Sequence, residues 1–174
     1  MKRNEISMAK LIILRGNSGS GKTTIAKKLQ KNFGHGTLLI SQDVVRREML
    51  YVKDGDKPKV EKLLLQIALY GKNNCNIVIL EGILNSKWYR DLFEKLQGEF
   101  KENIFAYYFD IPFEETVKRH KQRAISNEFG EEEMKKWWIE KDLLNFIQET
   151  IIRQEMGINE IIEMICKDIN NEIN

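Results

Sequence analysis

Cysteine is scarce in this chain of 174 residues, which contains only Cys75 and Cys166. The two lie far apart, neither belongs to a CxxC pair, and neither has a histidine close to it in the sequence. A disulfide framework and a zinc site are therefore excluded, because each needs more cysteine or histidine partners at short spacing.

Long hydrophobic runs are also missing. No uncharged stretch reaches the roughly 20 residues that a membrane-spanning helix needs. The charged N-terminal segment MKRNEISMAK is not followed by a signal-peptide core, because Arg15 and a glycine-rich loop interrupt the apolar run that starts at Leu11. We therefore expect no membrane partner and a cytoplasmic location, where ATP and Mg²⁺ are available.

An excess of charge of one sign is absent as well. The 28 basic and 26 acidic residues give a net charge of +2, which gives no indication of a surface that coats nucleic acid or binds anionic membranes. The length and the 42% hydrophobic content are those of an ordinary soluble domain, so we expect a single domain over residues 1–174.

The most informative segment is residues 16–24, GNSGSGKTT, which directly follow the apolar run 11–14. They match the GxxxxGK[ST] phosphate-binding loop in its strand–loop–helix setting. Glycine allows backbone conformations in which successive N–H groups turn toward phosphate oxygens, at the positive end of the next helix. The predicted nucleotide-binding residues are Gly16, Asn17, Ser18, Gly19, Ser20, Gly21, Lys22, Thr23 and Thr24.

Three side chains of this loop have predicted roles. Lys22 is expected to reach the β- and γ-phosphates, and the Thr23 hydroxyl is expected to hold Mg²⁺. Thr24 adds a hydroxyl near the α-phosphate. The sequence therefore predicts a protein that binds a nucleoside triphosphate.

Short apolar runs alternate with longer amphipathic ones along the chain, which is typical of a parallel sheet covered by helices. Strands are predicted at residues 11–15, 37–40, 77–80, 104–109 and 150–153. Helices are predicted at residues 23–33, 44–51, 59–70, 86–97, 113–124, 131–146 and 158–169. This is a doubly wound α/β arrangement, in which ligands bind at the carboxyl ends of the strands.

After the second predicted strand the chain reads SQDVVRRE, residues 41–48. Asp43 is placed to accept the proton of an acceptor hydroxyl in line with the γ-phosphate. Arg46 or Arg47 is placed to bind an anionic group of that acceptor. A local alternative is that Asp43 is a helix N-cap and that the arginines form a solvated helix face.

Glu81 and Gly82 follow the third predicted strand. A carboxylate at the end of an apolar strand is typical of a Walker-B-like element, which orients water on Mg²⁺ or contacts the acceptor. Gly82 is expected to let the backbone pass close to the ligand. The alternative is a strand-end glutamate that faces solvent.

Arg119 and Arg123 follow the fourth predicted strand and lie four residues apart, on one face of a helix. On a helical lid over residues 113–147, they are expected to close over the triphosphate and neutralise the charge that develops during transfer. An exposed basic helix is the alternative.

In residues 16–24, SQDVVR, Glu81-Gly82 and the Arg119/Arg123 pair, the chain resembles P-loop kinases of the nucleoside- and nucleotide-kinase type. It is similar above all to the bacterial branch that includes zeta toxins, chloramphenicol phosphotransferase and the kinase domains of polynucleotide kinases. The resemblance implies a three-layer P-loop NTPase fold with sheet order 2-3-1-4-5, ATP with Mg²⁺, and a base at Asp43. The Asp-Gly-Phe-Pro-Arg element of adenylate kinases and the Asp-Arg-Tyr element of thymidylate kinases are absent, which argues against a nucleoside monophosphate as acceptor.

The leading hypothesis is a kinase that transfers the γ-phosphoryl group of ATP to a hydroxyl of a nucleoside, sugar or antibiotic-like molecule. Its predicted catalytic residues are Lys22, Asp43, Arg119 and Arg123; Thr23 and Glu81 are the predicted metal site; Asp43, Arg46, Arg47, Glu81 and Gly82 are predicted to bind the acceptor. One alternative is a kinase for the 5′ end of a polynucleotide, which the near-neutral charge disfavours. Another is a regulatory ATPase without an acceptor.

Overall fold

A parallel sheet of five strands forms the centre of the protein. The computed structural model describes residues 9–122 and 130–171, and within them the strands follow the order β2-β3-β1-β4-β5. This is the predicted order of a P-loop NTPase. The strands are β1 (Lys10–Gly16), β2 (Thr37–Ser41), β3 (Ile77–Gly82), β4 (Ile104–Asp110) and β5 (Glu149–Arg153).

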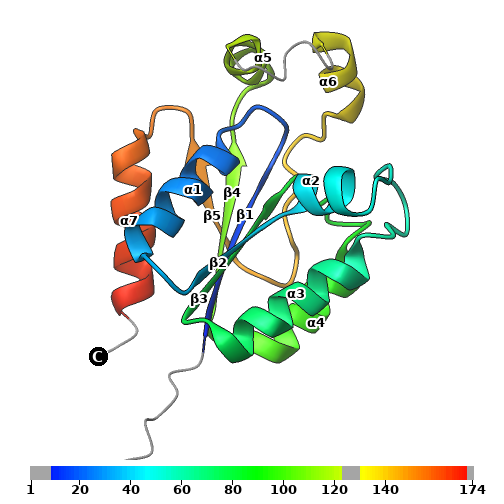
Figure 1. Cartoon of the computed structure of the whole chain (residues 1–174). Coiled ribbons are helices and arrows are strands. Elements are labelled where there is room, and N and C mark those ends of the chain that lie inside the picture. Colours follow the sequence, from blue (N-terminus) through cyan, green and yellow to red (C-terminus); the bar gives the residue numbers. More distant parts are fainter. Residues whose placement is uncertain (1–8, 123–129, 172–174) are drawn as a thin grey trace, which may run out of the picture.

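The central strand β1 is apolar on both faces because helices cover both faces of the sheet. Its residues Leu11, Ile12, Ile13 and Leu14 are fully buried. On one face, α1 (Lys22–Phe33) and α7 (Ile158–Asn171) form the outer layer, and on the other α3 (Glu61–Asn74) and α4 (Arg90–Phe100) do so (Figure 1).

The carboxyl ends of the strands meet at one edge, as expected for this fold. Arg15 of β1 is in register with Gly82 of β3 and with Tyr108 of β4. Ser41 of β2 is in register with Glu81 of β3. Helices α5 (Phe113–Lys121) and α6 (Glu131–Trp137) lie beyond this edge, at the top of Figure 1.

The helix predicted over residues 131–146 is wrong beyond Trp137, where α6 ends. The next residue has an extended backbone with ψ of 129°, and Lys141 adopts a left-handed conformation with φ of 47°. Leu144 and Ile147 are instead buried in the core on the α3/α4 face of the sheet. Tertiary packing of these apolar residues therefore overrides the helical periodicity.

Two other predicted helices are shorter or differently wound. The prediction over residues 44–51 corresponds to a short helix α2 (Gln42–Val44) and a π-helical turn η1 (Val45–Met49). The helix predicted from residue 86 starts at Arg90, and the turn before it is stabilised by the Asn85 side chain, which accepts hydrogen bonds from the backbone N–H groups of Lys87 and Trp88. No helix of the described ranges is long and apolar enough to cross a membrane.

Candidate active site

The phosphate-binding loop connects β1 to α1 and packs closely against α5. Gly19 has a φ of 81°, and a Cβ atom there would lie 2.6 Å from the carbonyl oxygen of Thr116. A side chain is therefore excluded both by the backbone conformation and by space. This close approach holds the start of the segment 113–147 against the loop.

Lys22 is buried within this loop, with 6% of its surface exposed. Its Nζ donates to the carbonyl oxygen of Asn17 at 2.8 Å and to Ser20 Oγ at 3.2 Å. Both acceptors belong to the loop, so the ammonium group lies against the loop and not in bulk solvent. This is the place where a phosphate-binding loop contacts phosphate oxygens.

Thr23 and Glu81, which the sequence predicts as one metal site, are in hydrogen-bond contact. The Thr23 hydroxyl donates to Glu81 Oε2 at 3.1 Å, and the Ser41 hydroxyl donates to Glu81 Oε1 at 2.5 Å. Glu81 is 3% exposed, so the predicted alternative of a solvent-facing glutamate is wrong. Ser41 was not predicted, although its register opposite Glu81 could have indicated it once the strand order was known.

The oxygens of this pair suit Mg²⁺. The ion prefers oxygen ligands at octahedral positions, and it usually takes one or two from the protein and others from substrate phosphates and water. A threonine hydroxyl and a buried carboxylate in hydrogen-bond contact supply that chemistry.

Asp43, Arg46 and Arg47 form one charged cluster on α2 and η1. Arg46 Nη2 lies 2.8 Å and Arg47 Nε 3.5 Å from Asp43 Oδ1. Ser41, and not Asp43, occupies the N-cap position of α2, so the N-cap alternative for Asp43 is wrong. The Asp43 side chain is 56% exposed and therefore accessible from solvent.

Below this cluster lies a polar group that sequence reasoning missed. Gln42 Nε2 donates to Asp54 Oδ2 at 2.8 Å and to the Tyr89 hydroxyl at 2.7 Å, and Tyr89 donates to Asp54 Oδ1 at 2.6 Å. Burial and the neighbouring Asp54 raise the pKa of Tyr89 far above its usual range, so its hydroxyl stays protonated as a donor. The three residues come from distant segments, so no sequence spacing reveals them.

The same polar group explains why residue 82 is a glycine. A Cβ atom at this position would lie 2.4 Å from Gln42 Oε1, so the absent side chain makes room for Gln42. Gln42 in turn is buried directly before Asp43. Gly82 thus allows α2 to start close to the end of β3.

Arg119 is the described member of the predicted arginine pair, and it reaches the phosphate-binding loop from α5. Its Nη1 donates to the Ser20 carbonyl oxygen at 3.1 Å, and its Nε donates to Glu115 Oε1 at 2.8 Å. The hydrogen bond from Arg119 lowers the pKa of Glu115 below its ordinary value. Arg123 lies outside the described residues.

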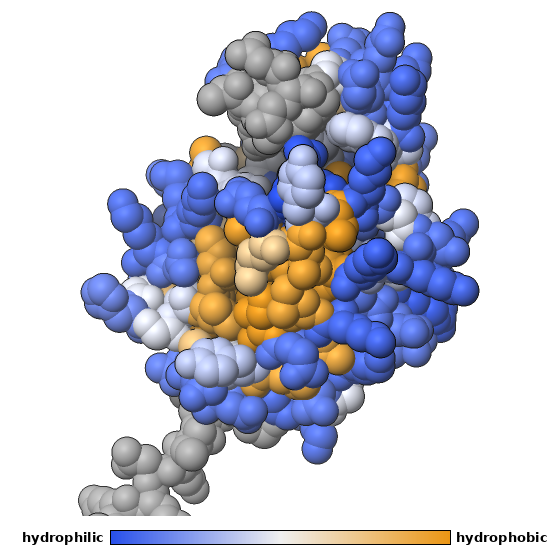
Figure 2. Space-filling view, turned by 45° about the vertical axis from the view of Figure 1, so that its right-hand side comes forward, coloured by the Kyte–Doolittle hydropathy of each residue, from blue (hydrophilic) through white to orange (hydrophobic). Residues whose placement is uncertain are grey.

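The side of the molecule that carries α2 and α3 exposes an apolar area bordered by hydrophilic residues (Figure 2). Large exposed hydrophobic residues of α2, η1 and the two positions after η1 are Val44, Met49, Leu50 and Tyr51. Apolar side chains are therefore exposed next to Asp43, Arg46 and Arg47 along α2 and η1.

The family model of the AAA domain matches residues 11–138 of this chain. The protein belongs to the AAA domain family. No curated protein sequence shows significant similarity to it.

Solved structures show which fold this AAA domain has. The APS kinase CysC of Mycobacterium tuberculosis, solved with AMPPNP and APS, is 14% identical with a TM-score of 0.68, over 94% of this chain and 98% of that chain. A gluconokinase from Sinorhizobium meliloti is also 14% identical with a TM-score of 0.65, over 94% and 93%. In the Pnkp1/Rnl/Hen1 RNA repair complex, one chain is 24% identical with a TM-score of 0.50, over 86% of this chain and 52% of that chain. The AAA domain described here therefore has the fold of P-loop kinases, whereas the narrower likeness to the zeta-toxin branch stays a prediction.

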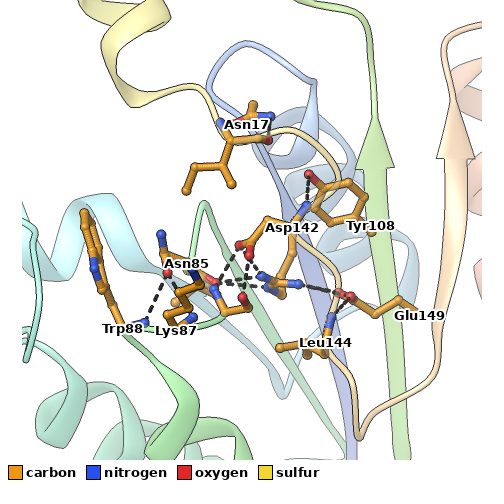
Figure 3. A network of polar contacts seen from close by, with 12 residues as sticks. Asn17, Asn85, Lys87, Trp88, Tyr108, Asp142, Leu144 and Glu149 are labelled. Carbon is orange, nitrogen blue, oxygen red and sulfur yellow. Dashed lines mark hydrogen bonds and ion pairs between the residues drawn. The ribbon is translucent and has the colours of Figure 1, made fainter.

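The AAA domain also contains a buried ionic network that the sequence did not indicate (Figure 3). Arg15, at the end of β1, is fully buried and pairs with Asp142 and Glu149, each at 2.8 Å. Both carboxylates lie more than 120 residues away along the chain, at sequence separations of 127 and 134. From the sequence, Arg15 only interrupted an apolar run.

Proposed function

We propose that this AAA domain protein is a phosphotransferase that moves the γ-phosphoryl group of ATP to a hydroxyl of a small molecule, such as a nucleoside, a sugar or an antibiotic-like compound. The observation that carries the proposal is that two groups of polar and charged residues lie at the same edge of the sheet. Lys22, Thr23 and Arg119 gather at the phosphate-binding loop, and Asp43 with its two arginines follows the end of β2.

The donor residues have electrostatic roles. Lys22 binds the β- and γ-phosphates, and Arg119 approaches the same loop from α5. Thr23 and Glu81 hold Mg²⁺, which when bound neutralises charge on the phosphates. Positive groups fixed before the reaction need no rearrangement while charge develops on the transferring group, and this is how they lower the barrier.

Asp43 is the proposed base. Both of its ion pairs use Oδ1, so Oδ2 can accept the acceptor hydroxyl proton while the arginines stay in place. The acceptor oxygen then bonds to the γ-phosphorus, the bond from that phosphorus to the β,γ-bridging oxygen breaks, and ADP leaves. Arg46 and Arg47 are proposed to bind an anionic or polar group of the acceptor.

The segment 113–147 is proposed to act as the lid. It starts with α5, which contacts the phosphate-binding loop through Arg119 and through the Gly19–Thr116 approach. It ends in irregular backbone that returns to the sheet. We include Arg123 in the proposal because it lies four residues after Arg119, and we place the activity in the cytoplasm, where ATP and Mg²⁺ are supplied.

The test is a screen of ADP release with ATP or GTP and Mg²⁺ against nucleosides, nucleotides, sugars, aminoglycosides and 5′-hydroxyl oligonucleotides. We expect one class of small molecule to stimulate ADP release and to gain phosphate, as detected by mass spectrometry. Phosphorylation of oligonucleotides alone would instead identify a polynucleotide kinase. This alternative is of interest because one chain of the RNA repair complex has a similar fold. ATP hydrolysis that no acceptor changes would identify a regulatory ATPase.

A further inference from the structure

Two residues that flank Gly16 both hold the chain where it returns from α6 to the sheet. We call residues 138–148 the return segment. Arg15 contacts it through Asp142, and Asn17 contacts it through Ile139; of these residues, Figure 3 labels Asn17 and Asp142. The start of the phosphate-binding loop is therefore joined on both sides to the end of the proposed lid.

Arg15 fixes one point of the return segment. Its guanidinium group pairs with Asp142 and with Glu149 at the start of β5, and it lies 5.3 Å from the Phe93 ring centroid and 5.8 Å from that of Tyr108. A buried charge is strongly destabilised when one partner is lost, so this arrangement is closely defined. Asp142 cannot move without disturbing β1.

The same arginine fixes the loop after β3. Its Nε and Nη2 donate to the carbonyl oxygen of Leu84 at 3.1 and 3.0 Å, and the N–H of Leu84 donates to Gln42 Oε1 at 3.2 Å. Leu84 has a left-handed backbone with φ of 47°, a conformation that persists in non-glycine residues only where neighbours enforce it. Ser86 of this loop also donates its N–H to Asp142 at 2.9 Å.

Asn17 fixes a second point and connects it to the catalytic lysine. Its Nδ2 donates to the Ile139 carbonyl oxygen at 2.7 Å, and its Oδ1 accepts from the Ile139 N–H at 3.1 Å. The backbone carbonyl of the same residue accepts the 2.8 Å hydrogen bond from Lys22 Nζ. A phosphate that binds Lys22 therefore competes for a group on the residue that holds the return segment.

We propose that Arg15 and Asn17 are positioning residues that couple nucleotide binding at the phosphate-binding loop to the position of the return segment. Nucleotide phosphates draw the Lys22 ammonium from the Asn17 carbonyl, and the Asn17–Ile139 pair passes the resulting shift to the return segment. Arg15 keeps Asp142 fixed, so the shift turns residues 138–141 about that point. This inference rests on the proposed nucleotide binding but not on the identity of the acceptor.

The experiment measures amide hydrogen exchange in residues 130–148 of the full chain with and without ATP and Mg²⁺. In wild-type protein we expect ATP to slow exchange in the return segment. In the Asn17→Asp variant, which loses the donor to Ile139, and in Asp142→Asn, we expect this ATP effect to shrink by about fivefold or more. Exchange is compared at ATP concentrations that saturate each variant, as determined by calorimetry, so that a weaker ATP affinity of a variant cannot by itself reduce the effect.

Arg15→Lys tests the contact that fixes Asp142, and Arg153→Lys is its matched control, since Arg153 is exposed at the end of β5 and lies outside the return segment. Thermal unfolding identifies variants that do not fold, and Asn17→Asp keeps the proposal testable if Arg15→Lys is one of them. An unchanged ATP effect on the return segment in Asn17→Asp overturns the inference while leaving ATP binding intact. Failure of the wild-type protein to bind ATP overturns the proposed function as well.

Discussion

Lys22 on the donor side of the site is 6% exposed and donates to its own loop, whereas the Asp43 side chain on the acceptor side is 56% exposed and pairs with two arginines one turn away. Lys22 is held by its hydrogen bond to the Asn17 carbonyl of the same loop, and Thr23 is held by its hydrogen bond to Glu81. Acceptor groups stand on a short helix and a π-helical turn, beside exposed apolar side chains.

The difference follows from what each side must bind. Triphosphate and Mg²⁺ present the same charges in every reaction cycle, so a rigid, preorganised site suits them. Near the proposed acceptor side, the buried Gln42 and Tyr89 are hydrogen-bonded to the half-buried Asp54, whereas the Asp43 side chain is 56% exposed. Substitutions on the two sides should therefore separate into effects on nucleotide binding and effects on the acceptor.

The largest expected effect is on the donor side. Lys22→Ala should reduce phosphoryl transfer by about a thousandfold or more, because it removes the charge that contacts the β- and γ-phosphates. Lys28→Ala, an exposed residue of α1, is the matched control and should leave turnover near the wild-type value. Near-normal turnover of Lys22→Ala in a coupled ADP-release assay would refute the assignment of the phosphate-binding loop.

Asp43→Asn should come next, with a loss of about a hundred- to a thousandfold in kcat, since the amide cannot take the hydroxyl proton. ATP affinity should stay within about threefold of wild type, because Asp43 lies on the acceptor side. Glu48→Gln, an exposed acid on the following turn, serves as the control. A parallel loss of ATP affinity in Asp43→Asn would remove the distinction between the two sides.

Arg119→Ala should cost about a hundredfold in turnover, the typical effect of one preorganised charge. Its Nη1 contact with the Ser20 carbonyl places it on the donor side, so ATP affinity should fall together with kcat. Lys118→Ala, with 73% of its side chain exposed on the same helix, is the comparison. If Arg119→Ala raised only the acceptor KM, the arginine would belong to the other half of the site.

The smallest expected effect concerns acidity. Because the hydrogen bond from Arg119 lowers the folded-state pKa of Glu115 below 4.5, the pair stabilises the fold fully above pH 4.5 and loses this contribution as pH falls through the lower, folded-state value. Thermal unfolding between about pH 3 and about pH 7 should therefore show a slightly steeper acid loss for wild type than for Glu115→Gln. If the melting temperatures of wild type and Glu115→Gln fell equally with decreasing pH, the ion pair between Glu115 and Arg119 would not stabilise the fold.

The sequence alone determined the phosphate-binding loop motif and the order of elements along the chain. The strands predicted at residues 11–15, 77–80 and 104–109 lie within β1, β3 and β4. Thr23 and Glu81, chosen for their positions after a loop and a strand, are in hydrogen-bond contact. Such features are local: an apolar run, a glycine pattern and a charged residue at a strand end each express their chemistry within a few residues.

Tertiary structure alone decided the features that depend on distant partners. Residues 138–146 have helical spacing but leave the helix, because Leu144 packs into the core and Asp142 pairs with Arg15. Likewise, Gln42 meets Tyr89 at a separation of 47 residues. Buried charges and amides need hydrogen-bond or ion-pair partners. Only the folded sheet brings these partners within reach.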